Sequence, residues 1–220
     1  MIKTAFAIVL GIAASLQTLP PQFPRADAKQ LVDNERVTVW DATWPKGKAA
    51  ASYRNPDDMV TVELNDAAYR VAGKDSPTSV KVGQVAYIKN GTSQSETGTS
   101  DIPRHIIAID LKNTKVQPME NKSGYPDAFP REGIKKVLDN ERLTVWDYSW
   151  TPGKPTPMHF HAKDVVTIYL STGEIRSTAL DGTVTVNSVI PGFTRFNPRN
   201  RTHTDELIKG SGRAIIVELK

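Results

Sequence analysis

The sequence predicts an all-β protein built from two similar halves. The first observation is a repeat, because residues 29–48 and 135–154 are identical at 12 of 20 positions at a constant offset of 106 residues. The second is a series of short alternating or β-branched apolar runs separated by turns rich in Gly, Asn and Asp, which is typical of strands. The third is that no sustained helical periodicity follows residue 28. Many short strands at regular spacing favour a sandwich or a barrel, and two copies favour two of them.

The first 28 residues are typical of a cleavable secretory signal. Lys3 precedes a 13-residue apolar run, 4–16, which is shorter than the roughly 18 residues that a transmembrane helix needs. The Ala-Asp-Ala at 26–28 provides the small residues expected at a cleavage site, and a cut within 13–15 is an alternative. A buried N-terminal helix of the fold is the other interpretation. We expect an exported protein, periplasmic or secreted, without a membrane span.

The two copies are expected at 29–112 and 135–220, joined by a polar linker rich in Pro and Gly at 113–134. In the first copy, the expected strands lie at 36–40, 59–64, 80–82 and 106–112. In the second copy, they lie at 142–146, 165–170, 183–186 and 214–220. Both copies end alike, in an apolar run that closes with Leu-Lys.

The pair His159 and His161 is the strongest candidate for a functional site. The chain has four histidines, and these two are separated by a single residue and precede an apolar strand. Residues two apart in a strand project from the same face, so both imidazoles can face one point. A third histidine, His203, follows about forty residues later, after Pro191 and Gly192. The plain alternative is a polar strand edge with no ligand.

With these residues in place, the second copy resembles a cupin, a small jelly-roll barrel with two conserved motifs. The first motif is matched by Gly153, His159, His161 and Gly173, and the second is approached by Pro191, Gly192 and His203. The resemblance implies a bicupin, with two tandem cupin-type jelly-roll β-barrels, whose second barrel holds a metal site. The acid that many cupins carry four or five residues after the second histidine would fall on Val165 or Val166, neither of which can ligate. We therefore expect three histidines plus water.

Three neutral imidazoles suit one divalent transition metal ion, with Fe, Mn, Zn, Cu and Ni as the candidates. Three protein ligands leave positions open for water or substrate, which is the arrangement of a catalytic site. The offset places Tyr53 and Asn55 where the second copy has His159 and His161, and matching the downstream glycines places Gln94 where it has His203. The first copy should therefore hold no metal in this way. Its three residues could bind a small polar molecule or be purely structural.

Several further residues are candidates for ligand binding or for support of the site. Arg195, Arg199 and Arg201 flank His203, and one that points inward could hold a carboxylate, although all three could equally face solvent. Tyr169 and Phe196 are expected to be core or pocket-wall residues. Asp164 and Glu206 could orient an imidazole, and His105 is expected at the surface or in a cap. These last three, Asp164, Glu206 and His105, would lie outside the ligand set itself.

The composition of the chain argues against some classes of function and against disulfide bonds. The net charge of +4 is spread over interspersed charges, which argues against nucleic-acid binding, and the absence of cysteine excludes disulfides. The expected partner is a small molecule, and a homo-oligomer is compatible with the sequence. The first hypothesis is a metalloenzyme, with a dioxygenase ahead of a metal-assisted isomerase or lyase. The alternatives are a non-catalytic ligand-binding or metal-binding cupin and, less well supported, a storage protein.

Overall fold

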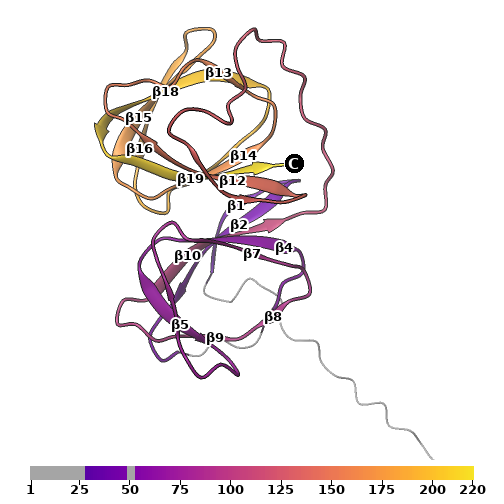
Figure 1. Cartoon of the computed structure of the whole chain (residues 1–220), viewed down its shortest axis with the longest axis vertical. Coiled ribbons are helices and arrows are strands. Elements are labelled where there is room, and N and C mark those ends of the chain that lie inside the picture. The colour runs from indigo at the N-terminus through magenta and orange to yellow at the C-terminus, as the bar shows by residue number, and fades with distance from the viewer. Residues whose placement is uncertain (1–27, 49–52) are drawn as a thin grey trace, which may run out of the picture.

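The computed structural model describes residues 28–48 and 53–220, which form strands and turns without any helix. The all-β prediction is therefore confirmed for this part of the chain. It follows that none of the described residues belongs to a helix able to cross a membrane. Nearly all of the predicted signal segment, 1–27, lies outside the described residues. Figure 1 shows two β-rich lobes stacked on one another, the first made of β1–β10 and the second of β11–β19.

The strands of the first lobe are β1 (Lys29–Asp33), β2 (Val37–Trp44), β3 (Tyr53–Arg54), β4 (Asp58–Glu63), β5 (Ala67–Val71), β6 (Thr78–Val80), β7 (Val85–Ile88), β8 (Ser93–Gln94), β9 (Glu96–Gly98) and β10 (Arg104–Leu111). Those of the second lobe are β11 (Lys135–Asp139), β12 (Leu143–Trp150), β13 (His159–His161), β14 (Val165–Tyr169), β15 (Gly173–Ala179), β16 (Val184–Val189), β17 (Thr194–Asn197), β18 (Arg201–Gly210) and β19 (Gly212–Leu219).

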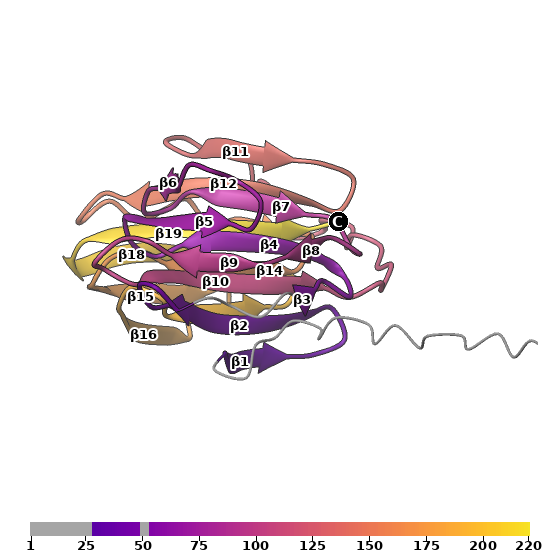
Figure 2. The same ribbon diagram turned by 90° about the horizontal axis from the view of Figure 1, so that it is seen from below.

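Each lobe contains a five-stranded antiparallel sheet with the same strand order. The order is β1-β2-β10-β4-β7 in the first lobe and β11-β12-β19-β14-β17 in the second. The β1–β2 pair has a register shift between Gln30 and Val32, and the β11–β12 pair has the same shift between Lys136 and Leu138. Figure 2 places the outer strands β1 and β11 at opposite edges of the molecule. In the second lobe, a four-stranded sheet, β13-β18-β15-β16, faces the five-stranded sheet. In the first lobe, two smaller sheets, β6-β5-β9 and β3-β8, take the place of this four-stranded sheet.

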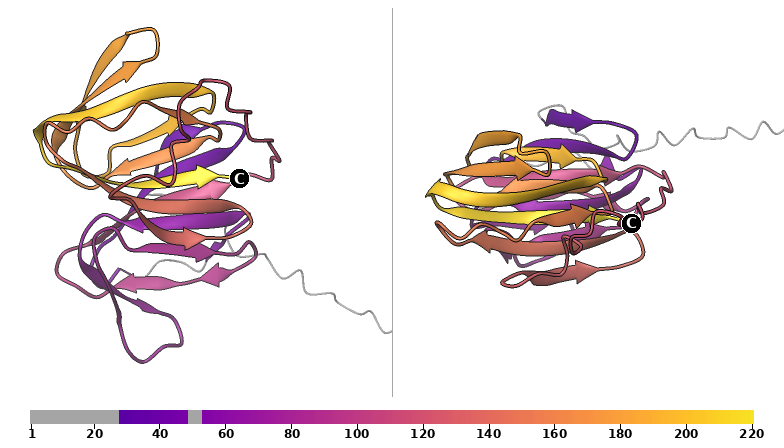
Figure 3. Two further views of the ribbon diagram at one scale, coloured as in Figure 1. Left: turned by 45° about the horizontal axis from the view of Figure 1, so that its top comes forward. Right: turned by 90° about the horizontal axis from the view of Figure 1, so that it is seen from above.

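The two five-stranded sheets pack on each other through one apolar core. Side chains alternate between the faces of a strand, so Leu143 and Val145 of β12 face this core while Trp146 and Trp150 face the interior of the second lobe. The core contains fully buried Val and Ile side chains from both lobes, including Ile107 of the first lobe and Ile215 of the second. The views in Figure 3 show the strands of the two lobes lying over one another across this contact. Burying each such side chain stabilises the fold by roughly 1.5–3 kcal/mol.

The segment between the lobes, which the sequence presents as a linker, runs along the second lobe. The Met119 amide donates to the Ala162 carbonyl at 2.8 Å, and the Ala128 amide donates to the Phe160 carbonyl at 2.8 Å. The Phe160 amide in turn donates to the Pro126 carbonyl at 2.9 Å. These bonds extend the edge of β13 and hold the following residues, 129–131, beside the histidines.

Gly173 opens β15 where the backbone of the β18–β19 turn comes close. A Cβ at this position would lie 2.6 Å from the Ser211 carbonyl oxygen and 2.8 Å from that of Lys209, both of which are backbone atoms. No side chain fits there without moving the chain, which is the physical reason for glycine at this position of the first motif.

Candidate metal centre

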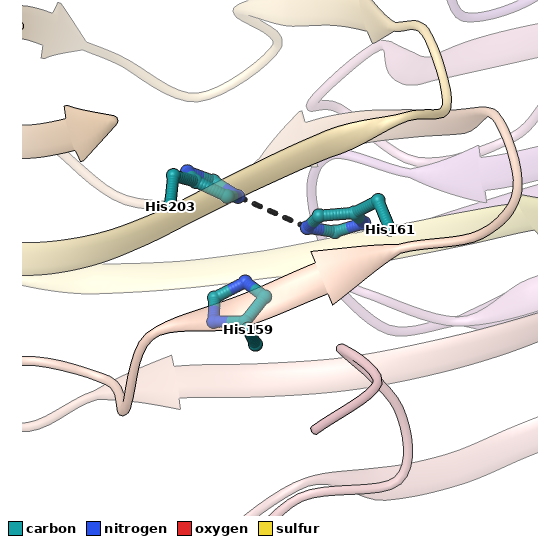
Figure 4. Close-up of side chains that lie close together, drawn as sticks. All are labelled: His159, His161 and His203. Atoms are coloured by element: carbon teal, nitrogen blue, oxygen red, sulfur yellow. Dashed lines mark hydrogen bonds between the residues drawn. The ribbon is translucent and has the colours of Figure 1, made fainter. Parts of the chain in front are cut away.

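The three histidines of the second lobe come together on two paired strands. His159 and His161 lie on β13, and His203 lies on β18 directly opposite His159. All three side chains are buried, and each offers a nitrogen within 4.8 Å of the others. Figure 4 shows the three rings facing a common space between the strands. The convergence expected from the i, i+2 spacing and the distant third histidine is therefore present.

Hydrogen bonds on the far side of two rings direct their lone pairs inward. His159 Nδ1 lies 2.7 Å from the Pro157 carbonyl oxygen, which can only accept, so Nδ1 carries the proton and Nε2 the lone pair. His203 Nδ1 lies 3.2 Å from Asp205 Oδ1 and 2.9 Å from Ser177 Oγ. Donation to Asp205 likewise leaves the lone pair on Nε2. A carboxylate or carbonyl that fixes the tautomer in this way is a regular feature of histidines that bind metals.

The inward-facing nitrogens need a cation or a proton between them. His161 Nε2 and His203 Nε2 are 3.0 Å apart, and two lone pairs at that distance repel unless something positive lies between them. Metal–nitrogen bonds of about 2.0–2.1 Å in a tetrahedral site place ligand nitrogens roughly 3.4 Å apart, so small rotations of the rings would accommodate an ion. The donor set therefore fits a divalent transition metal.

The protonation states also suit a metal site. Burial, and then the charge of Arg131, lowers the pKa of His159 to about 4, and burial lowers the pKa of His161 well below its usual value. Both imidazoles are therefore neutral at pH 7, which is the form that coordinates a metal. Burial opposes ionisation of Asp205, but the hydrogen bonds from His203 and Ser177 and the charges of His203 and His159 together outweigh burial, so the pKa of Asp205 lies below its usual range.

The histidines lie in a cavity of about 700 Å³ in the second lobe. Apolar side chains form part of its wall, including Phe129, Trp150 and Ile175. Of the residues proposed from the sequence for ligand binding, Tyr169, Arg195 and Arg201 line this cavity. The volume is enough for a small organic molecule beside an ion.

Other candidates from the sequence lie elsewhere. Phe196 packs against the core between the lobes, because it pairs with Val166, whose side chain faces that core. The Asp164 carboxylate bonds Arg36 Nη1 at 3.0 Å, and Glu206 pairs with Arg176 at 3.1 Å. The carboxylate beside an imidazole is that of Asp205, so the hypothesis for Asp164 and Glu206 is wrong.

Two residues of the site were missed in the sequence, Asp205 and Arg131. Asp205 stands two residues after His203 on the same strand, so the strand period that relates His159 to His161 could have identified it. Arg131 comes from the segment between the lobes. Its Nη1 lies 3.3 Å from His159 Nε2, and no local pattern places that segment against β13.

In the first lobe, the residues that replace the histidines bond to one another. Tyr53 pairs with Gln94 as His159 pairs with His203. The Tyr53 hydroxyl donates to Gln94 Oε1 at 3.2 Å, and Asn55 Nδ2 donates to the same oxygen at 3.4 Å. These three side chains offer no imidazole.

A buried ion cluster lies next to these residues, because the Tyr53 hydroxyl is also 3.3 Å from Glu96 Oε2. Arg104 contacts Glu63 at 2.6 Å and Glu96 at 3.1 Å, and all three side chains are buried. Arg104 lies opposite Trp44, whereas Gly212 lies opposite the corresponding Trp150 in the second lobe. A large cation therefore fills the first lobe where a glycine leaves the second one open.

Comparisons with known proteins identify the fold. No family model matches the sequence, and no curated protein matches it. Among solved structures, a cupin 2 conserved barrel domain protein from Leptotrichia buccalis is similar over 90% of this chain and 92% of its own, with 14% identity and a TM-score of 0.58. Protein Ylba from E. coli is similar over 93% and 88%, with 12% identity and a TM-score of 0.61. Bacillus subtilis oxalate decarboxylase, a protein with Mn(II) centres, is similar over 93% and 78%, with 11% identity and a TM-score of 0.59.

At these identities the likeness concerns the fold and carries no activity across. It agrees with the motifs in the second copy and with the all-β architecture, so the resemblance read from the sequence is confirmed at the level of the fold. The chain has the fold of the cupin-domain proteins.

Proposed function

We propose that this chain is an exported bicupin that binds one divalent transition metal ion through His159, His161 and His203 and acts on a small molecule. The observation that carries the proposal is the convergence of three buried imidazoles, two with their outer nitrogens bonded, on one wall of a large cavity. Structural metal sites are closed by four protein ligands, whereas three protein ligands leave a position open. The proposed site is therefore one for exchange or catalysis.

The ion would be Fe, Mn, Zn, Cu or Ni, and when bound it would polarise a carbonyl, activate water or, if redox-active, handle dioxygen. Around it, Asp205 holds the His203 tautomer and the Pro157 carbonyl holds that of His159. The apolar wall at Phe129 and Trp150 would exclude water from a bound molecule. A dioxygenase is the first candidate reaction class, ahead of a metal-assisted isomerase or lyase.

Metal analysis of the full chain, purified without a histidine tag, tests the site. We expect about one transition metal ion per chain in the wild type and loss of it in H159A/H161A. His105→Ala is the matched control, because His105 is the remaining histidine and pairs with Asp41 in the first lobe. Equal metal content in H159A/H161A and wild type would refute the proposal.

The same proposal includes two tandem barrels and export through the N-terminal signal. The shared sheet order and the repeated sequence support the tandem arrangement, in which the first barrel is structural and holds no transition metal. The apolar run at 4–16 and the small residues at 26–28 support export. N-terminal sequencing of the protein from a periplasmic extract is expected to begin after Ala28, and an intact Met1 in that fraction would contradict cleavage.

A non-catalytic ligand-binding cupin is the second candidate, and the ready-made cavity beside the histidines favours it equally. Oxygen uptake by the metal-loaded protein over a panel of diketones, catechols and flavonols separates the two. Uptake that is lost in H159A/H161A supports the dioxygenase. Saturable binding of a panel member without turnover supports the binding protein.

A further inference from the structure

Arg131 is a cationic residue in direct contact with the histidine cluster. Its guanidinium lies over the Tyr148 ring at 4.2 Å and over the Phe129 ring at 5.3 Å, which fixes its plane between two aromatic walls. Its Nη1 lies 3.3 Å from His159 Nε2, and its buried Nε has no hydrogen-bond partner among the described residues. Burial lowers the pKa of Arg131, yet an arginine keeps its charge at neutral pH.

The cavity has more positive than negative side chains. Arg131, Arg195 and Arg201 line it, against Asp181 and Asp205. The Asp205 carboxylate is already engaged by His203. A divalent ion held by neutral imidazoles would add two more positive charges. An anionic ligand would balance this excess of positive charge.

Arg131 differs from the other two arginines in the acceptor that it contacts. The Arg195 Nη1 atom donates to Asn187 Oδ1 at 2.7 Å, and Arg201 Nε donates to the Pro198 carbonyl at 3.1 Å. Arg131 Nη1, in contrast, donates to the His159 Nε2 lone pair, which is the one that a metal ion would take. If a metal ion takes the lone pair of His159 Nε2, Arg131 Nη1 loses its acceptor and can donate to another acceptor beside the ion.

We infer that the cavity binds a small organic carboxylate, with Arg131 as its charge partner next to the histidine cluster. This inference rests on the proposed function and names the substrate class of the same site. The planar guanidinium fork matches a carboxylate, and the apolar wall of Phe129, Trp150 and Ile175 matches a carbon body attached to it. The segment between the lobes therefore has a binding role, because it carries both Phe129 and Arg131 to the cavity.

A matched pair of probes tests the inference: 4-fluorobenzoate, which is an anion, and 4-fluorobenzamide, its neutral counterpart. Fluorine NMR line broadening measures the affinity of both for the full chain, before and after treatment with a chelator. We expect wild type to bind the carboxylate about tenfold more tightly than the amide, the effect of one charge-assisted hydrogen bond. In Arg131→Gln, the preference should fall to about twofold or less, and Arg131→Lys should keep part of it because the charge remains.

Arg176→Gln is the control, because it removes one positive charge from an exposed pair outside the cavity, and its preference should equal that of wild type. The inference is overturned if Arg131→Gln keeps the tenfold preference, if neither probe binds, or if inorganic phosphate displaces fluorobenzoate at lower concentration than acetate does. Metal content measured on the same samples separates the two proposals. Wild type that contains no metal as purified, yet prefers the carboxylate both before and after chelation, would refute the metal site and support the role of Arg131.

Discussion

Arg36 and Asp164 form a buried ion pair across the contact between the two lobes, with Nη1 and Oδ2 3.0 Å apart. A second pair, Arg142 with Asp58, crosses the same contact at 3.0 Å. The two arginines are separated by 106 positions, and so are the two aspartates, which is the offset of the sequence repeat. In each lobe, one arginine therefore pairs with an aspartate of the other lobe, and the two pairs occupy equivalent positions in the repeat.

Removing one member of this buried pair should destabilise the whole protein. We expect Asp164→Ala to lower the free energy of unfolding by about 3–5 kcal/mol, because it leaves the Arg36 guanidinium buried and unpaired. Urea unfolding followed by tryptophan fluorescence measures the change. Lys46→Ala, in a highly exposed pair with Asp101, is the control and should change it by less than about 1 kcal/mol. A loss below about 1 kcal/mol in Asp164→Ala would mean that the pair does not hold the lobes together.

The same pair explains a departure from the cupin motif. An acid near this position serves as a ligand in many cupins, whereas here Asp164 faces the contact between the lobes. The sequence could show that Asp164 was out of step with His161, because strand alternation pointed it to the opposite face. It could not show what lay on that face, because the packing of one sheet on another depends on residues more than a hundred positions apart.

The all-β fold and the histidine cluster were predictable because they rest on local periodicity. The two-residue strand period placed His159 and His161 on one face, and the repeat showed which positions lacked a histidine in the first copy. Arg131 was not predictable, because its segment has no periodicity and its position is set by hydrogen bonds to β13. The Arg104 cluster was missed for a related reason, since only the pairing of β10 with β2 shows that Arg104 and Gly212 correspond.

Replacing Asp110 with asparagine should stabilise the protein at neutral pH. Burial raises the pKa of Asp110 to about 6, although the Trp40 indole donates to its Oδ2 at 2.8 Å. The folded state therefore binds the proton more tightly than the unfolded chain, whose pKa is near 3.8, so stability falls as the pH rises from 3.8 to 6. At pH 7, Asp110→Asn should gain up to about 3 kcal/mol, and at pH 4 almost nothing. Thermal unfolding at both pH values measures this, and a gain that is equal at both would contradict it.

The buried cluster of the first lobe should depend on its arginine. Arg104→Met leaves Glu63 and Glu96 close together and buried without a cation, and should cost about 3–5 kcal/mol at pH 7. Burial already raises the pKa of Glu63, and loss of the arginine should raise it further, so the variant should regain stability towards pH 5 as the carboxylates take up protons.

Denaturant unfolding at pH 7 and pH 5 measures the effect of Arg104→Met. Adding Glu63→Gln and Glu96→Gln to the variant removes the unpaired charges and should restore part of the stability at pH 7. A loss that is the same at both pH values, and unchanged by the two glutamines, would show that Arg104 acts through packing on Trp44 and Tyr69 rather than through charge.

Asp205 should set the metal affinity of His203 without being a ligand. Its Oδ1 lies 3.2 Å from His203 Nδ1, and asparagine at this position removes the charge that favours a proton on Nδ1. We expect Asp205→Asn to weaken metal binding about 10–100-fold, as measured by competition with a chelating dye, because partners of this kind orient the ring and raise its basicity. Glu206→Gln is the matched control, since the neighbouring Glu206 pairs with Arg176 on the outer side of the strand. Equal loss of affinity in both variants would attribute the effect to the net charge of the lobe, whereas loss in Asp205→Asn alone assigns it to the bond with His203.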